Sequence, residues 1–174
     1  VMIFPKKFWD NTQFIGSIPN AYLNPTTNQW ENKEYWPAYV NLHYYINKPI
    51  LIAFTSGDFA LAMEKRDNTT ITQNIMSILR NTYGKYIPNP RQVIVTRWKN
   101  DPYSRGSYTS LTTKALANNG DFKILQRPEA QGHLVFAGEG TSDKYSTTVH
   151  GAYLSGQRAG EQIYHAISTT PDSR

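Results

Sequence analysis

The segment from Leu134 to Ile167 constrains the fold of this chain more than any other part of the sequence. A short apolar run from Leu134 to Ala137 predicts a strand, which ends at Gly138-Glu139-Gly140-Thr141-Ser142. A long helix with several small residues is predicted from about Val149 to Ile167. The strand leaves a carboxylate at its carboxyl end, and the free amides at the start of the helix point back toward it. This arrangement predicts a site for an anion or an electron-rich ligand.

The composition is that of a folded domain without disulfides. The chain has 174 residues, of which 39% are hydrophobic and 18% charged, and it contains no cysteine. It therefore has no thiolate metal ligand, and it is compatible with a reducing compartment. His43, His133 and His165 have no partner at metal-ligand spacing, so we expect no metal site.

Charge and hydropathy exclude further classes of function. No apolar run approaches the roughly 20 residues of a membrane-spanning helix, so we expect no membrane span. The net charge of +5 is spread along the chain, so we expect a solvated surface and no nucleic-acid partner.

The first half of the chain is predicted to be rich in strands. Strand patterns run over Tyr35–Ile46, Ile50–Phe54 and Gln92–Trp98. The last of these alternates, with Val93, Val95 and Arg97 on one side and Ile94, Thr96 and Trp98 on the other. Val1-Met2-Ile3-Phe4 begins like a strand entered midway, with no start methionine, so we expect a fragment or a processed piece.

Two helices are predicted in this half. The better supported one runs from Ile71 to Tyr83, with Thr70 as its N-cap and Gly84 at its end. Its apolar stripe consists of Ile71, Ile75, Ile78 and Leu79. A shorter helix is predicted near Phe59–Lys65, capped by Ser56 or Asp58. Further along, Ala115–Asp121 reads as a linker and Lys123–Leu125 as a short strand.

Three large aromatic residues are evenly spaced in a loop. Trp98, Tyr103 and Tyr108 are five residues apart, and Pro102 and Gly106 lie between them. Flat rings on a tight loop are suited to the wall of a slot for planar or cationic ligands. From the residues alone, packing in a core is the alternative.

Two long motifs resemble one known family. Arg97-Trp98-Lys99-Asn100-Asp101-Pro102-Tyr103-Ser104-Arg105-Gly106-Ser107-Tyr108 and the Leu134–Gly156 segment are similar to the flavin-dependent amine oxidases. This group comprises polyamine oxidases, monoamine oxidases and lysine-specific histone demethylases. The resemblance covers Val1 to about Ile167. It is closest to polyamine oxidases, on residues such as Phe8-Trp9 and His150-Gly151-Ala152-Tyr153.

The resemblance implies the fold class and the domains. It implies an α/β (α+β) fold that forms the C-terminal portion of a two-domain FAD-dependent amine oxidase. Residues 1–117 would belong to a mixed-sheet substrate-binding domain, and residues 118–168 would supply the closing strand and helix of the FAD-binding domain. Residues 169–174 are expected to fray.

The resemblance also assigns roles around the aromatic loop. Tyr108 would form one wall of the aromatic cage before the flavin ring, and Trp98 and Tyr103 would lie against the flavin side of the substrate cavity. Ser107 stands where monoamine oxidases carry the cysteine that bonds to flavin. A serine there implies non-covalently bound FAD.

Further roles fall on the second motif. Gly138 would allow close backbone approach, and Glu139 would hydrogen-bond the ribityl or a neighbouring part of FAD. The amides of Thr148 and Val149 would meet the pyrimidine edge of the flavin, where a helix N-terminus stabilises the negative charge of the reduced ring. Thr148 also replaces the second cage tyrosine of monoamine oxidases. We expect His150 to be structural rather than a catalytic base.

The chain lacks parts that such an enzyme needs. It has no G-x-G-x-x-G turn for the pyrophosphate, and the family's flavin-proximal lysine would precede Val1. We therefore expect the N-terminal half of the same protein as a partner, and we expect the chain alone to be inactive.

The parent protein is expected to oxidise an amine, with a polyamine as the first candidate, using O2 and releasing hydrogen peroxide. A histone-lysine demethylase-like oxidase and a non-catalytic binding or interaction module are the alternatives.

Overall fold

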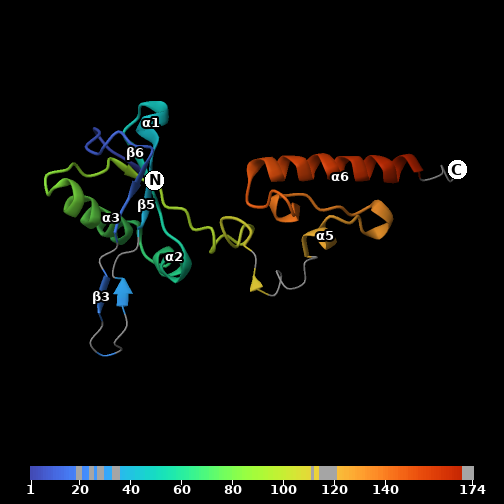
Figure 1. Ribbon diagram of the computed structural model, residues 1–174, viewed down its shortest axis with the longest axis horizontal. Coiled ribbons are helices and arrows are strands. Elements are labelled where there is room, and N and C mark those ends of the chain that lie inside the picture. The colour runs from blue at the N-terminus through green and yellow to red at the C-terminus, as the bar shows by residue number, and fades with distance from the viewer. Residues whose placement is uncertain are drawn as a thin grey trace. The chain divides into compact units, whose positions relative to one another are not determined.

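A computed structural model of the chain describes residues 1–18, 21–23, 26, 30–32, 36–110, 112–113 and 121–169. They form two compact units, Val1–Tyr103 and Ser104–Arg174 (Figure 1). Helices and antiparallel strands occur together, in keeping with the expected α/β (α+β) class. The predicted domain boundary at residues 117 and 118 lies outside the described residues and stays a prediction.

The first unit is built on a five-stranded sheet in the order β2-β5-β6-β1-β7. The strands are β1 Met2–Ile3, β2 Phe14–Gly16, β5 Ala38–Asn41, β6 Ile50–Phe54 and β7 Gln92–Val93. A separate pair consists of β3 Ala21–Leu23 and β4 Trp30–Asn32. Every ladder among these described strands is antiparallel, so the parallel pairing of a mixed sheet is not found in them.

The strand predicted over Tyr35–Ile46 is only partly correct. Tyr35 lies outside the described residues, β5 ends at Asn41, and α1 follows at Leu42–Ile46. The Asn41 side chain caps this helix by accepting a hydrogen bond from the His43 amide. A local cap therefore overrides the strand preference of the aromatic residues that follow it.

The predicted strand at β6 is confirmed, and so are both helices of this unit. α2 runs over Gly57–Glu64, after Ser56 in the cap position. α3 runs over Asn68–Tyr83, and its last helical hydrogen bond is donated by the amide of Gly84, which has φ of 97°. Its N-cap is Asp67 rather than Thr70, because the Asp67 carboxylate accepts a hydrogen bond from the Thr70 amide at 2.8 Å.

The strand predicted over Gln92–Trp98 is much shorter than expected. β7 pairs with β1, which has only two residues in the sheet, so regular pairing stops at Val93. The predicted alternation nevertheless continues. Val93, Val95 and Arg97 are half-buried, whereas Ile94, Thr96 and Trp98 are exposed.

The core of the first unit lies between one face of the sheet and α3. Figure 1 shows α3, in green, beside the strands. The buried stripe of α3 is Ile71, Ile75, Met76, Ile78 and Leu79, which includes all four predicted positions. It packs on Met2, Phe4, Trp9, Trp36, Tyr39 and Leu51. The core therefore unites residues from both ends of this unit.

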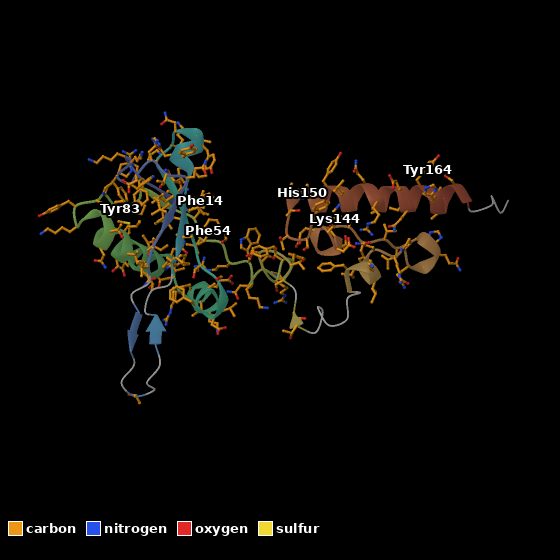
Figure 2. The ribbon with its side chains drawn as sticks, in the orientation of Figure 1. Phe14, Phe54, Tyr83, Lys144, His150 and Tyr164 are labelled. Atoms are coloured by element: carbon orange, nitrogen blue, oxygen red, sulfur yellow. The ribbon has the colours of Figure 1, made fainter. Side chains whose placement is uncertain are left out.

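The opposite face of the sheet is apolar and partly open. The register places Phe14 opposite Val40, and Val40 opposite Ile52, so the three side chains share a face. Phe54 lies on the same face, two residues along from Ile52. Phe14 is 63% exposed and Phe54 50% exposed (Figure 2). Exposed aromatic residues on one sheet face are typical of an interaction surface.

Replacing both Phe14 and Phe54 by threonine should lower the surface hydrophobicity of this chain without unfolding it. We expect binding of a hydrophobic dye to fall several-fold, while the free energy of unfolding changes by about 0.5 kcal/mol or less, as for other surface sites. Dye fluorescence and urea unfolding would measure the two quantities. Tyr86→Thr is the control, because Tyr86 is 88% exposed and lies in the loop after α3. Unchanged dye binding, combined with a fall of more than about 2 kcal/mol in the free energy of unfolding, would mean that the two rings are packed against other protein groups.

The second unit contains α5 Asp121–Leu125, the 3-10 turns η1 Ala130–Gly132 and η2 Glu139–Thr141, and α6 Val149–Thr169. The long predicted helix is thus confirmed. The strand predicted at Lys123–Leu125 is wrong, since these residues lie in α5. The Gln126 amide continues the helical pattern by donating to the Phe122 carbonyl. Of the predicted linker, only Asp121 is described. The frayed tail is described only at Thr169, which ends α6.

The strand predicted at Leu134–Ala137 is also wrong for this chain. Only Leu134 pairs, in an isolated bridge with Glu129. A strand needs a neighbour for its backbone groups, and the described part of this unit contains no other strand. Among the described residues, no helix has the length and hydropathy needed to cross a membrane.

Candidate functional site

The start of α6 is organised by Thr148. Its hydroxyl accepts a hydrogen bond from the Gly151 amide at 3.1 Å and donates to the Tyr145 carbonyl at 2.6 Å. Its carbonyl accepts the first helical hydrogen bond, from Ala152. The amides of Val149 and His150 lie before that bond, so the helix gives them no intrahelical partner. The predicted flavin-edge position is therefore a helix N-terminus, at which the amides of Val149 and His150 precede the first helical hydrogen bond.

Gly151 allows the chain to fold tightly before this helix. It is buried, and a Cβ atom built on it would collide with the Tyr145 carbonyl oxygen and lie 2.8 Å from the carbonyl carbon. The turn at Tyr145 and the first turn of α6 can approach this closely only because residue 151 has no side chain.

The Gly138–Thr141 turn is fastened to α6. The Gly138 amide donates to the buried Ser155 hydroxyl at 2.8 Å, and the Gly138 carbonyl accepts from the Thr141 hydroxyl at 2.9 Å. Gly138 has φ of 133°, a conformation that residues with a Cβ rarely adopt. This positive φ favours glycine in the turn, but a Cβ atom added to Gly138 would meet nothing within 4 Å, so its role in close backbone approach stays a prediction.

Glu139 connects two separate segments of the second unit. One carboxylate oxygen accepts hydrogen bonds from the amide and the hydroxyl of Thr109, both at 2.8 Å. The other oxygen accepts from the Thr147 amide at 2.6 Å. The Glu139 side chain therefore contacts the residue after Tyr108 and the residue before Thr148.

The same contacts set the charge state of Glu139. Partial burial acts to raise the pKa of its carboxyl, but the hydrogen bonds from Thr109 and Thr147 outweigh it and the pKa is lowered. Because the folded-state pKa is below the unfolded one, this stabilisation is present above the ordinary glutamate pKa. It is lost as the pH falls through the folded value. Glu139 is thus a carboxylate at neutral pH.

Three further residues hold this site together, of which the sequence pattern indicated only Ser155, as one of the small residues of the last helix. Besides Thr109 and Ser155, Arg158 donates to the carbonyls of Gln126 and Phe136 and to the Thr141 hydroxyl, at 2.8 to 2.9 Å. The small residues Gly151, Ser155 and Ala159, which are four residues apart in the sequence, are all buried. Small residues at that spacing indicate a face in close contact with other backbone.

The three predicted aromatic residues do not pack a core in this chain. Trp98 is 46% exposed, Tyr103 98% and Tyr108 67%. Trp98 and Tyr103 belong to the first unit and Tyr108, with Ser107, to the second. Their predicted roles in a substrate cavity and an aromatic cage remain predictions.

The loop that carries Trp98 is firmly attached within the first unit. The Arg97 guanidinium donates to the carbonyls of Glu64 and Arg66 and to the Asn68 side chain. The Glu64 carboxylate in turn accepts from the amides of Lys99 and Asn100. These contacts fix the backbone on both sides of the indole.

His150 belongs to the turn before α6. Its ring lies edge-on to Tyr145, with centroids 4.7 Å apart, and its Nε2 atom is 3.5 Å from the Thr148 hydroxyl. Figure 2 shows it at the beginning of α6, with Lys144 in the preceding loop. These contacts support the structural role that we predicted. Within the described ranges, no group of three or more histidine and acidic residues could hold a metal ion.

Comparison with known proteins identifies similar sequences. A family model described as "Flavin containing amine oxidoreductase" matches residues 1–164. "Histone demethylase-like protein A" of Aspergillus fumigatus is 33% identical over 96% of this chain and 16% of its own length. "Possible lysine-specific histone demethylase 1" of Drosophila melanogaster is 33% identical over 94% of the chain and 18% of its own length. "Lysine-specific histone demethylase 1 homolog 2" of Arabidopsis thaliana is 32% identical over 96% of the chain and 21% of its own length.

These matches bear on two predictions. The resemblance to flavin-dependent amine oxidases is confirmed at the level of the family. The finer expectation of a polyamine oxidase is not supported by the relatives above, whose names refer to histone demethylases. The chain spans about a fifth of the length of these relatives.

Proposed function

Because the chain belongs to the family of flavin-containing amine oxidoreductases, we propose that it forms the C-terminal part of an FAD-dependent amine oxidase. In this proposal residues 1–117 contribute to the substrate-binding domain and residues 118–168 to the FAD-binding domain. The pyrophosphate-binding turn and the flavin-proximal lysine would come from a separate, N-terminal segment of the same protein.

The residues around the start of α6 fit a flavin. The amides of Val149 and His150, which precede the first hydrogen bond of α6, suit an electron-rich ring edge, and Gly138 keeps the nearby turn free of a side chain. We assign Thr148, Val149, Gly138 and Glu139 to this contact. Bound FAD would accept a hydride from the carbon beside the amine nitrogen, leaving an imine for hydrolysis, and O2 would take the electrons as hydrogen peroxide.

The aromatic residues would serve the substrate. We propose that Tyr108 orients the amine as one wall of a cage, and that Trp98 and Tyr103 line the cavity and contribute to a dry environment. Ser107 has no thiol with which to bond a flavin, so the cofactor would be held without a covalent link.

We favour the methylated lysine of a histone-type peptide as the substrate. The single observation that carries this choice is the use of Thr148. Where a second cage ring would stand, the side chain instead caps α6 through the Gly151 amide. A one-sided cage leaves room for a lysine on a peptide, and the names of the relatives agree with this class of substrate. Polyamines remain the second candidate, on the resemblance described above.

The native protein that contains this sequence should be yellow and should demethylate a peptide. We expect flavin absorbance bands, and we expect hydrogen peroxide and formaldehyde in equal amounts from a dimethyl-lysine histone peptide. Spermine and the unmethylated peptide are the parallel assays. Turnover of spermine alone would favour the polyamine alternative. A native protein without flavin would overturn the proposal and favour an interaction module.

A further inference from the structure

We propose that Glu139 is a positioning residue, whose carboxylate holds the Tyr108–Thr109 segment and the Thr147–Thr148 segment at a fixed separation. This inference rests on the proposed function, because it explains how the cage residue and the flavin-edge residues keep their relative geometry. Besides its proposed contact with the cofactor, Glu139 would thus have a second role, which depends only on its contacts with other protein groups.

The contacts join two separate segments of the second unit and are specific. Glu139 is 30 residues from Thr109 and 8 residues from Thr147, and it receives three hydrogen bonds from these two residues. Two of the three donors are backbone amides, and the third is the Thr109 hydroxyl. Thr147 has φ of 66°, an uncommon conformation for a residue with a Cβ atom, so its amide is held where a relaxed chain would seldom place it.

The two neighbouring glycines complete the arrangement. A Cβ atom added to Gly140 would lie 2.6 Å from the Thr109 hydroxyl oxygen, so a side chain at residue 140 would displace this hydroxyl from its present position. Gly138 supplies the positive φ that starts the turn and anchors it to Ser155. The Gly138-Glu139-Gly140 motif therefore acts as one unit, in which each residue has a separate task.

The chemistry of a carboxylate explains why a glutamate is needed. A glutamine has one acceptor oxygen and one donor nitrogen, and its nitrogen would face either the Thr109 donors or the Thr147 amide. One of the two segments would then lose its partner. A carboxylate offers about four acceptor positions, of which three are used. One position is left for a hydroxyl of a bound ligand, so positioning and cofactor contact are compatible.

Hydrogen exchange in this chain provides the test. In Glu139→Gln we expect the backbone amide of Thr109, of Thr147 or of both to exchange about tenfold faster. A charged hydrogen bond of about 1.4 kcal/mol corresponds to that factor. Glu161→Gln is the matched control, since Glu161 is exposed on α6. Unchanged exchange at both amides in Glu139→Gln would overturn the inference.

A second pair of variants keeps the test decisive if Glu139→Gln does not fold. Thr109→Val removes only the hydroxyl donor, and Thr109→Ser keeps it. We expect the pKa of Glu139, followed by NMR, to rise in the valine variant and to stay near its original value in the serine variant. Equal pKa values in both would contradict the proposed contact.

Flavin binding by the native protein separates this inference from the proposed function. Weaker flavin binding in Glu139→Gln with unchanged amide exchange would leave the enzyme proposal standing and refute the positioning role. Faster exchange in a native protein that holds no flavin would support the positioning role and refute the enzyme proposal.

Discussion

Replacing Gly151 by alanine is expected to destabilise the second unit by about 3 kcal/mol, because the new methyl group has no space. It would collide with the backbone carbonyl of Tyr145 and lie 3.0 Å from the Thr148 hydroxyl. Backbone atoms cannot rotate away as the end of a side chain can, so the turn before α6 has to move. The Thr148 cap would be lost with it, and flavin binding by the native protein should fall as well.

The same helix provides a matched control. Gly156 is exposed, and a Cβ atom added to it would meet nothing within 4 Å. Gly156→Ala in this chain should be neutral or stabilise it by up to about 1 kcal/mol, since alanine favours a helix interior over glycine. Urea unfolding followed by circular dichroism would compare the two. Equal stabilities of the variants would show that the Tyr145 turn does not press against residue 151.

The helices were predictable because their signals are local. Ile71, Ile75, Ile78 and Leu79 repeat at helical spacing, and all four are buried in α3. α6 was predicted to within two residues at its far end. The cap of α3 was misplaced by three residues, because Thr70 and Asp67 are both good cap residues and only the backbone geometry decides between them.

The strands were less predictable because pairing depends on distant residues. Leu134–Ala137 has the composition of a strand, but composition supplies no neighbour, and only Leu134 makes a bridge. Gln92–Trp98 keeps its alternation of buried and exposed side chains. It pairs for just two residues, because its partner β1 is only two residues long. At Asn41 a side-chain cap, which no periodicity shows, turns the chain into α1.

In the candidate site, too, several residues were predictable from the sequence but their contacts were not. The sequence and its resemblance identified Glu139 and Thr148 as important, but not what either contacts within the protein. One partner of Glu139 is Thr109, 30 residues earlier, and no local pattern connects them. Thr148 was noted as a missing ring, whereas its hydroxyl caps α6. The small residues of α6 indicated Ser155, but the hydrogen bonds between loops could not have been predicted.

Asn41→Ala is expected to destabilise the first unit by about 3 to 5 kcal/mol, since it leaves several buried polar groups without partners. Asn41 is fully buried. Its side-chain oxygen accepts from the Trp9 indole at 2.8 Å and from the His43 amide at 3.0 Å, and its nitrogen donates to the Thr12 carbonyl at 2.7 Å. Urea unfolding monitored by tryptophan fluorescence would report the loss directly.

Two further variants distinguish the hydrogen-bond network from simple loss of volume. Asn11→Ala removes an exposed asparagine whose side-chain oxygen accepts from the Lys7 ammonium, and it should cost about 0.5 kcal/mol or less.

Asn41→Asp keeps the acceptor for Trp9 and His43 but directs a carboxylate oxygen at the Thr12 carbonyl. Burial would raise the pKa of this aspartate in the folded state, so its protonated form, which can donate to Thr12, would be the stable one. The Asn41→Asp variant should therefore be closest to the original protein in acid and lose stability as the pH rises through the folded-state pKa. A penalty independent of pH would mean that Thr12 does not require a donor, and that Asn41 contributes chiefly by accepting from Trp9 and capping α1.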